Sequence, residues 1–176
     1  LEWVAENHIS PAVANYSLSS KKNSKVDQAA ADLVDSGVTL IVSAGNEDGD
    51  ACERSPARAT RPIKVGAVKS SGARWVSSSE PDVGSNYGSC VSLFAPGSAL
   101  TFALSTGTTD TDTGSGTSYA APFVAGLAAM YLADHPNALP VQVKSYILAM
   151  STANILSNLG SGSPNLFLYT RSGEHK

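Results

Sequence analysis

The stretch Val38-Thr39-Leu40-Ile41-Val42 and the four residues after it, Ser43-Ala44-Gly45-Asn46, decide the fold of this chain. The first five residues form a nearly continuous apolar run, which is typical of a strand buried on both faces of a parallel sheet. The next four are small or polar, and α/β sheets bind their ligands at the carboxyl ends of the strands. The stretch therefore predicts a buried central strand that leads into a functional site.

The segments around this strand alternate between helical and strand-like patterns. We expect helices over residues 1–9, 24–37, 118–133 and 140–150, and further strands over residues 12–18, 63–68, 91–95 and 166–169. Ser24 is the expected N-cap of the second helix. The segments 70–84 and 106–115 are rich in Ser, Thr, Gly and Asp and are expected to be exposed loops. The alternation predicts an α/β fold of three layers, with a mostly parallel sheet and helices on both faces.

The chain opens on a helix that no strand precedes. Parallel sheets are built from strand, crossover and strand, so we expect the N-terminal part of the domain to lie upstream of residue 1. The sequence contains no internal repeat and no second domain boundary. On this interpretation, residues 1–176 are the C-terminal portion of a single domain.

The composition limits the classes of partner. Of the 176 residues, 42% are hydrophobic and 15% are charged, which supplies enough apolar surface for one globular core. The formal net charge is -3, so no excess of basic residues is available to bind a phosphate backbone, and nucleic acid is not an expected partner. No apolar run is long enough to cross a bilayer, and a membrane is not an expected partner either.

The two cysteines, Cys52 and Cys90, lie far apart, and the three histidines, His8, His135 and His175, are scattered. A structural zinc site needs about four such ligands at close spacing, so we expect no metal site of this kind. The spacing alone is equally compatible with a disulfide and with two free thiols.

The stretch from Gly114 to Gly126 reads Gly-Ser-Gly-Thr-Ser-Tyr-Ala-Ala-Pro-Phe-Val-Ala-Gly and places Ser118 where a loop passes into an apolar helix. The free N–H groups and the positive dipole of a helix N-terminus would face an anion formed beside this hydroxyl. These features suit a nucleophile whose attack creates an oxyanion. For an isolated serine, an ordinary helix cap is the simpler interpretation.

The whole pattern Gly-Thr-Ser-x-Ala-x-Pro-x-x-Ala-Gly closely resembles the nucleophile motif of the subtilisin-like serine peptidases, with Ser118 in the place of the nucleophile. The resemblance implies that Asn46 donates a hydrogen bond to the oxyanion. It further implies that two segments form the walls of the pocket for the substrate's P1 side chain, the first made by Ser43, Ala44 and Gly45 and the second by Ser17, Leu18 and Ser19. The second segment would also pair with the substrate backbone like an added strand. Ser19 stands where the family usually has Gly.

The resemblance covers nearly all of the chain and is closest to the proteinase K-like group. It implies a disulfide between Cys52 and Cys90, and hence a secreted, extracellular or vacuolar location. Related proteases often hold calcium with an Asp where this chain has Ser92, a neutral and weaker oxygen donor. We therefore expect a lost or weakened calcium site and assign no cofactor.

The family mechanism also needs an Asp and a His, the latter in a His-Gly-Thr context that none of the three histidines has. The implied partners are a polypeptide substrate, an N-terminal segment that carries the Asp and the His, and a propeptide or protein inhibitor. Loss of the histidine alone costs about 2 × 10⁶ in turnover in a subtilisin, so this chain by itself is expected to be nearly inactive. The alternative is a non-catalytic protein that keeps the fold for binding or as an antigen.

Overall fold

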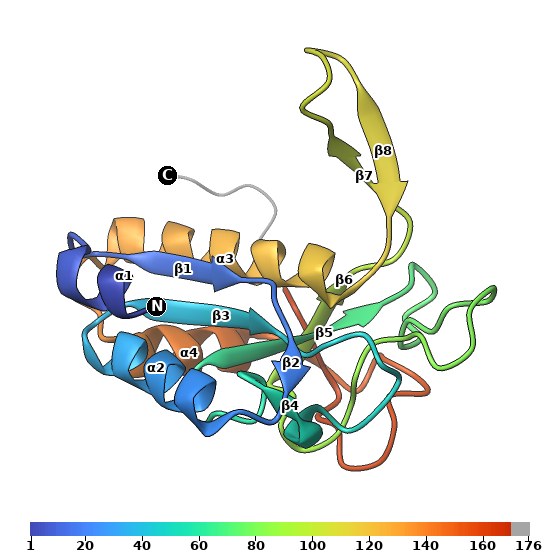
Figure 1. Cartoon of the computed structure of the whole chain (residues 1–176), viewed down its shortest axis with the longest axis horizontal. Helices are drawn as coiled ribbons and strands as arrows, with labels where there is room; N and C mark the ends of the chain where they lie inside the picture. The colour runs from blue at the N-terminus through green and yellow to red at the C-terminus, as the bar shows by residue number, and fades with distance from the viewer. Residues whose placement is uncertain (170–176) are drawn as a thin grey trace.

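The computed structural model describes residues 1–169, and its centre is a six-stranded sheet in the order β1-β3-β5-β6-β10-β9 (Figure 1). The strands are β1 (Val13–Tyr16), β3 (Thr39–Ser43), β5 (Ile63–Val68), β6 (Leu93–Pro96), β10 (Leu166–Phe167) and β9 (Thr152–Ala153). Neighbouring strands are parallel except for the β10–β9 pair. All five residues of β3 are buried, as expected for the apolar run.

Helices cover both faces of the sheet, so the α/β fold expected from the sequence is confirmed. On one face, α1 (Glu2–Asn7) and α2 (Ser24–Asp35) pack with Leu40 and Val42 of β3. On the other, α3 (Thr117–Asp134) and α4 (Pro140–Met150) enclose a core with Ile41 and Val65. None of the helices within residues 1–169 is long and apolar enough to span a bilayer.

Two local expectations were wrong. The N-cap of α2 is Asn23, whose side chain accepts hydrogen bonds from the N–H groups of Lys25 and Val26. Ser24 is instead the first residue of the helix, because either residue can cap and the extended backbone falls at Asn23. The segment 106–115 is not all loop, since β8 (Thr111–Gly114) pairs with β7 (Leu100–Ala103) in a hairpin that projects from the body of the molecule (Figure 1).

The segment 70–84 is also not simply an exposed loop. Trp75 is buried in the main core, and its backbone N–H donates to the carbonyl of Ala67 in β5. A segment of polar composition therefore contributes a large apolar side chain to the sheet. The exposed residues of this segment are Ser70, Ser71 and residues 78–82.

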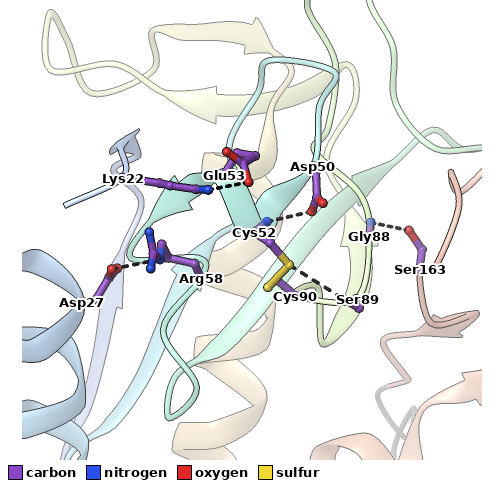
Figure 2. Close-up of a disulfide and its surroundings, with 10 residues drawn as sticks. All are labelled: Lys22, Asp27, Asp50, Cys52, Glu53, Arg58, Gly88, Ser89, Cys90 and Ser163. Carbon is purple, nitrogen blue, oxygen red and sulfur yellow. Dashed lines mark hydrogen bonds and ion pairs between the residues drawn. A yellow bond between two sulfur atoms is a disulfide. The ribbon is translucent and has the colours of Figure 1, made fainter. Parts of the chain in front are cut away.

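The structure contains the disulfide that the resemblance implied. Cys52 lies in the short helix η1 (Ala51–Glu53), and its partner Cys90 precedes β6 (Figure 2). The bond joins positions 38 residues apart in the sequence. The segment beside it continues into β4 (Arg54–Ser55), which pairs with β2 (Ser20–Lys21), so the cross-link holds a region poor in regular structure.

Removal of this cross-link should destabilise the fold. For a loop of this length, the chain-entropy model gives a loss of about 4 kcal/mol in the free energy of unfolding for Cys52→Ala/Cys90→Ala. Urea unfolding of the oxidised protein, the reduced protein and the double variant would measure it. Equal stability of the oxidised protein and the double variant would contradict the structural role of the bond.

Lys64 is a buried lysine in the middle of the sheet, in β5. Burial and the nearby charge of Lys144 lower its pKa from 10.5 to about 8, and burial also lowers the pKa of Lys144. Between pH 8 and pH 10.5 the unfolded chain therefore binds more protons than the folded one at this site. The free energy of unfolding consequently rises with pH across this window.

The Lys64→Met variant should be more stable than the parent at pH 7, by roughly 3 kcal/mol if the full pKa difference is expressed. Its stability should also rise less between pH 8 and pH 10.5, with Lys144 supplying the remainder. Denaturant unfolding as a function of pH measures both effects, and Lys25→Met at an exposed lysine of α2 is the control. A profile unchanged by Lys64→Met would show that its ammonium is not desolvated.

Candidate functional site

Ser118 lies in the first turn of α3, at the carboxyl edge of the sheet, and is half-buried. Its Oγ donates a hydrogen bond to the carbonyl of Ser17, at 3.1 Å, and Ser17 Oγ donates to the carbonyl of Ser118, also at 3.1 Å. This reciprocal pair joins the segment after β1 to the start of α3, which are 101 residues apart in the sequence. Ser118 as a residue is partly exposed and is not part of the buried core.

Asn46 lies beside Ser118 because its side chain is bonded to the preceding residue. Asn46 Oδ1 accepts from both the backbone N–H and the Oγ1 hydroxyl of Thr117, each at 2.8 Å. A backbone N–H can only donate, so these contacts fix which end of the amide faces Thr117. The Nδ2 group therefore points away from Thr117, and none of the described residues accepts a hydrogen bond from it.

The backbone N–H of Ser118 is a second free donor. It belongs to the first turn of α3, where no carbonyl of the helix is available, and none of the described residues accepts from it. Within residues 1–169, Asn46 Nδ2 and this N–H are thus two donors without an acceptor at the start of α3. Such a pair can stabilise an oxygen on which negative charge develops, with added support from the positive end of the helix dipole.

Two glycines leave room for the side chains of Asn46 and Asn86. Gly116 has φ +148°, and a Cβ built there would lie 3.1 Å from Asn46 Nδ2. Gly45 has φ +98°, and a Cβ there would lie only 2.3 Å from Asn86 Nδ2. A side chain at either position would displace an amide of the site or strain the backbone.

The loop after β3, residues 44–49, is held in place by hydrogen bonds to Asn86, whose side chain is fully buried. Its Oδ1 accepts from the N–H groups of Glu47 and Gly49, both at 3.0 Å, and its Nδ2 donates to the carbonyl of Ala44 at 2.9 Å and to Glu47 Oε2 at 2.7 Å. These four bonds span Asn46 on both sides. The sequence analysis assigned no role to Asn86.

Glu47 is the carboxylate nearest to Asn46 in the sequence, but it is already engaged. Burial raises the pKa of this carboxyl, yet hydrogen bonds from Arg54 and Asn86 together with the Arg54 charge outweigh it, so the pKa lies below its ordinary value. The group is therefore ionised and paired at neutral pH. It is poorly suited to accept a proton from a nucleophile.

The structure brings the two expected pocket segments together. A Cβ at Gly45 would lie 3.0 Å from Ser19 Oγ, so the end of the segment after β1 meets the segment after β3. Ser43 and Ala44 are buried, which leaves the backbone rather than these side chains to face a ligand. Leu18 is 63% exposed. Ser19 has no positive φ, so its Cβ requires no backbone strain where the family usually has glycine.

Neither histidine of the described region can act on Ser118. His135 caps the far end of α3, a helix of 18 residues, which separates it from Ser118 by about 25 Å. His8 follows α1, and a Cβ built at Gly37, just before β3 and at the opposite edge of the sheet from Ser118, would lie 3.8 Å from its Nε2. His175 lies outside the described residues. Within residues 1–169, Ser118 therefore has no histidine partner.

A cleft of about 530 Å³ opens beside Asn46, and the sequence analysis did not anticipate it. It is lined by Asn46, Lys69, Trp75, Val76, Ser77, Ser78, Ser79, Glu80, Val83, Ser98 and Ser115. Most of these residues belong to one segment, residues 75–83. Buried Trp75 anchors that segment and so positions its polar residues at the cleft.

The structure is thus that of an α/β protein in which Ser118 lies at the start of a helix, close to backbone N–H groups and to the Asn46 amide. The chain belongs to the subtilase family, because the family model described as "Subtilase family" matches residues 1–167. It is 47% identical over 170 residues to an extracellular serine proteinase of Thermus sp. (strain Rt41A) and 41% identical to alkaline serine exoprotease A of Vibrio alginolyticus. Each match covers 97% of this chain.

Solved structures agree with the sequence comparison. A cold adapted subtilisin-like serine proteinase matches 98% of this chain with a TM-score of 0.88 and 40% identity. The chain spans 40% and 30% of the lengths of the two curated relatives and 59% of that solved chain. These matches show the family and the fold of the chain.

Truncation of Asn86 should destabilise the protein and loosen the loop that carries Asn46. Asn86→Ala leaves several buried partners unsatisfied, and we expect a loss of about 3 kcal/mol in the free energy of unfolding. Urea unfolding measures the loss, and Asn137→Ala, at an exposed asparagine after α3, is the control. Equal stability of the two variants would contradict the role assigned to the four hydrogen bonds.

Proposed function

We propose that this chain is the part of a subtilisin-like serine endopeptidase that carries the nucleophile and the oxyanion donors. Ser118 Oγ attacks the carbonyl of a peptide bond, and Asn46 Nδ2 with the Ser118 N–H stabilises the oxyanion. The observation that carries this proposal is the bond from Thr117 to Asn46 Oδ1, since it turns the amide so that the donor end is free. Membership of the subtilase family supports the same assignment.

The proton from Ser118 needs a base, which an upstream segment with a His and an Asp supplies in this proposal. The absence of a histidine near Ser118 within residues 1–169 and the partial coverage of the relatives both support this division. In the present structure Ser118 Oγ donates to the Ser17 carbonyl, which accepts a hydrogen bond but cannot take up the proton. The chain by itself is accordingly expected to be nearly inactive.

The substrate is an extended polypeptide in this proposal. Its backbone pairs with Ser17, Leu18 and Ser19, and its P1 side chain enters between this segment and Ser43 to Gly45. The leaving-group half of the substrate has room in the cleft beside Asn46. A propeptide or protein inhibitor would use the same groove.

We place the protein outside the cell or in a vacuole. The support is the Cys52–Cys90 bond, which persists in oxidising compartments, and the similarity to the Thermus relative, which is named an extracellular serine proteinase. The alternative, a non-catalytic or antigenic protein with this fold, requires that the complete encoded protein lack the His and the Asp.

The complete encoded protein should react with a fluorophosphonate probe through Ser118. Ser118→Ala should abolish labelling, because the probe forms its bond with the activated serine oxygen. Ser145→Ala, at an exposed serine of α4, serves as the control and should be labelled like the parent. Labelling that persists in Ser118→Ala would assign the nucleophile elsewhere, and no labelling of the parent would favour the non-catalytic alternative.

In the complete encoded protein, Asn46→Ala should lower kcat for peptide hydrolysis by about 100- to 1,000-fold with little change in KM, the scale found for such a donor in a subtilisin. The interaction forms mainly in the transition state, so substrate binding is affected little. Steady-state kinetics with a peptide substrate would measure the effect, with Asn7→Ala on α1 as the control. A change in KM alone would place Asn46 in substrate binding rather than in oxyanion stabilisation.

A further inference from the structure

Lys144 makes an unusual contact at the opposite edge of the sheet from Ser118. Its Nζ donates to three successive backbone carbonyls, those of Thr60 at 3.2 Å, Arg61 at 3.3 Å and Pro62 at 3.2 Å. The carbonyls belong to the bend that leads into β5, and Lys144 reaches them from α4. The three acceptors match the three protons of one ammonium group.

Three converging carbonyl oxygens are the kind of donor set that hard cations bind. Residues 60–62 lie in the bend before β5, and outside the helices and strands no backbone N–H of residues 1–169 donates to their carbonyls. Arg61 does not supply the charge, since its guanidinium pairs with Asp35 at 3.3 Å. The ammonium of Lys144 is therefore the cation that these three oxygens hold.

The same region is where the family resemblance implied calcium, and the residues present do not fit it. Ser92 Oγ accepts from the N–H of Lys64 at 3.1 Å, and the Ser92 N–H donates to the Lys64 carbonyl at 2.8 Å. The Lys64 side chain is itself buried and close enough to Lys144 to interact with its charge. No group of three or more Asp, Glu, His or Cys residues that could hold a metal occurs within residues 1–169.

We propose that residues 60–62 form a cation-binding bend whose resident cation is the side chain of Lys144 in place of a metal ion. The Lys144 ammonium orders the backbone just before β5, so that no cation from solution has to bind there. Removal of the side chain at position 144 should leave a vacant site that accepts a small ammonium ion or a free metal cation.

Access to such a site exists, because Thr60, Arg61 and Lys144 line a groove of about 490 Å³ between α2 and α4. Its other walls include Asp35, Leu139 and Val141. Both Leu139 and Val141 are more than half exposed, so the groove is open to solvent at this end. A small cation can therefore reach the carbonyls once the lysine stem is absent.

The test compares Lys144→Ala with Lys144→Met in the complete encoded protein. Both variants lose the ammonium and should melt about 5 °C below the parent, since charge-assisted hydrogen bonds are lost. Only Lys144→Ala removes the stem and leaves room for a free cation. Methylammonium chloride should therefore raise the melting temperature of Lys144→Ala relative to an equal concentration of sodium chloride. It should not do so for Lys144→Met, the parent, or the control Lys25→Ala.

Two results would overturn the proposal. One is a melting temperature of both variants equal to that of the parent, because the carbonyls would then need no cation. The other is an equal response of all four proteins to methylammonium, which would be a solvent effect. Potassium and calcium chloride, tested in the same way, identify which metal cations the vacant bend accepts.

A second arm tests the disagreement with calcium. Ser92→Ala should leave any calcium dependence of the parent's melting temperature unchanged, because Ser92 Oγ is bonded to the backbone of β5. Loss of calcium dependence in Ser92→Ala would place calcium at this strand and contradict the proposal. Both arms measure stability alone, so they are independent of whether Ser118 is the nucleophile.

Discussion

The hydrogen bond from the Thr117 N–H to Asn46 Oδ1 joins the end of β3 to the first turn of α3, and the geometry of the candidate site depends on it. It fixes the orientation of an amide whose other end is then free to donate. Because Thr117 is adjacent to Ser118, the same bond sets the distance between that donor and the serine. Gly116 lets the start of α3 approach the Asn46 side chain closely, because it has no Cβ. The buried Asn86 holds the loop that carries Asn46 through its hydrogen bonds to Glu47 and Gly49.

The candidate site and the contact of Lys144 with three backbone carbonyls lie at opposite edges of the parallel sheet. Ser118 and Asn46 lie at the carboxyl edge, where unpaired donors are available because strands end and a helix begins. At the opposite edge, unpaired carbonyls precede β5 and are satisfied by Lys144. The Cys52–Cys90 bond cross-links η1 to the segment before β6 and stabilises this irregular region. Backbone and amide donors are thus left free to bind a ligand at the carboxyl edge, whereas the carbonyls at the opposite edge already accept hydrogen bonds from Lys144.

The sequence predicted the parts of this structure that depend on local pattern. The apolar run at Val38–Val42 is long and bounded by small residues, so β3 was expected within one residue of its bounds. Asn23 displaced Ser24 as the N-cap because both residues can cap and the choice depends on backbone angles. The strand β8 was missed because its residues are polar and exposed, and only its pairing with β7 defines it. The roles of Asn86 and Lys144 could not be predicted from the pattern, since their partners are about 40 and 80 residues away in the sequence.

The central claim is that one reacting oxygen can meet Asn46 Nδ2 and the Ser118 N–H together while its carbon is bonded to Ser118 Oγ. The most direct test is a crystal structure of the complete encoded protein after reaction with a peptidyl phosphonate. The account predicts phosphorus bonded to Ser118 Oγ, with one phosphonyl oxygen about 2.7 to 3.1 Å from both donors. An adduct on another residue, or an adduct on Ser118 whose oxygens all face away from Asn46, would contradict it.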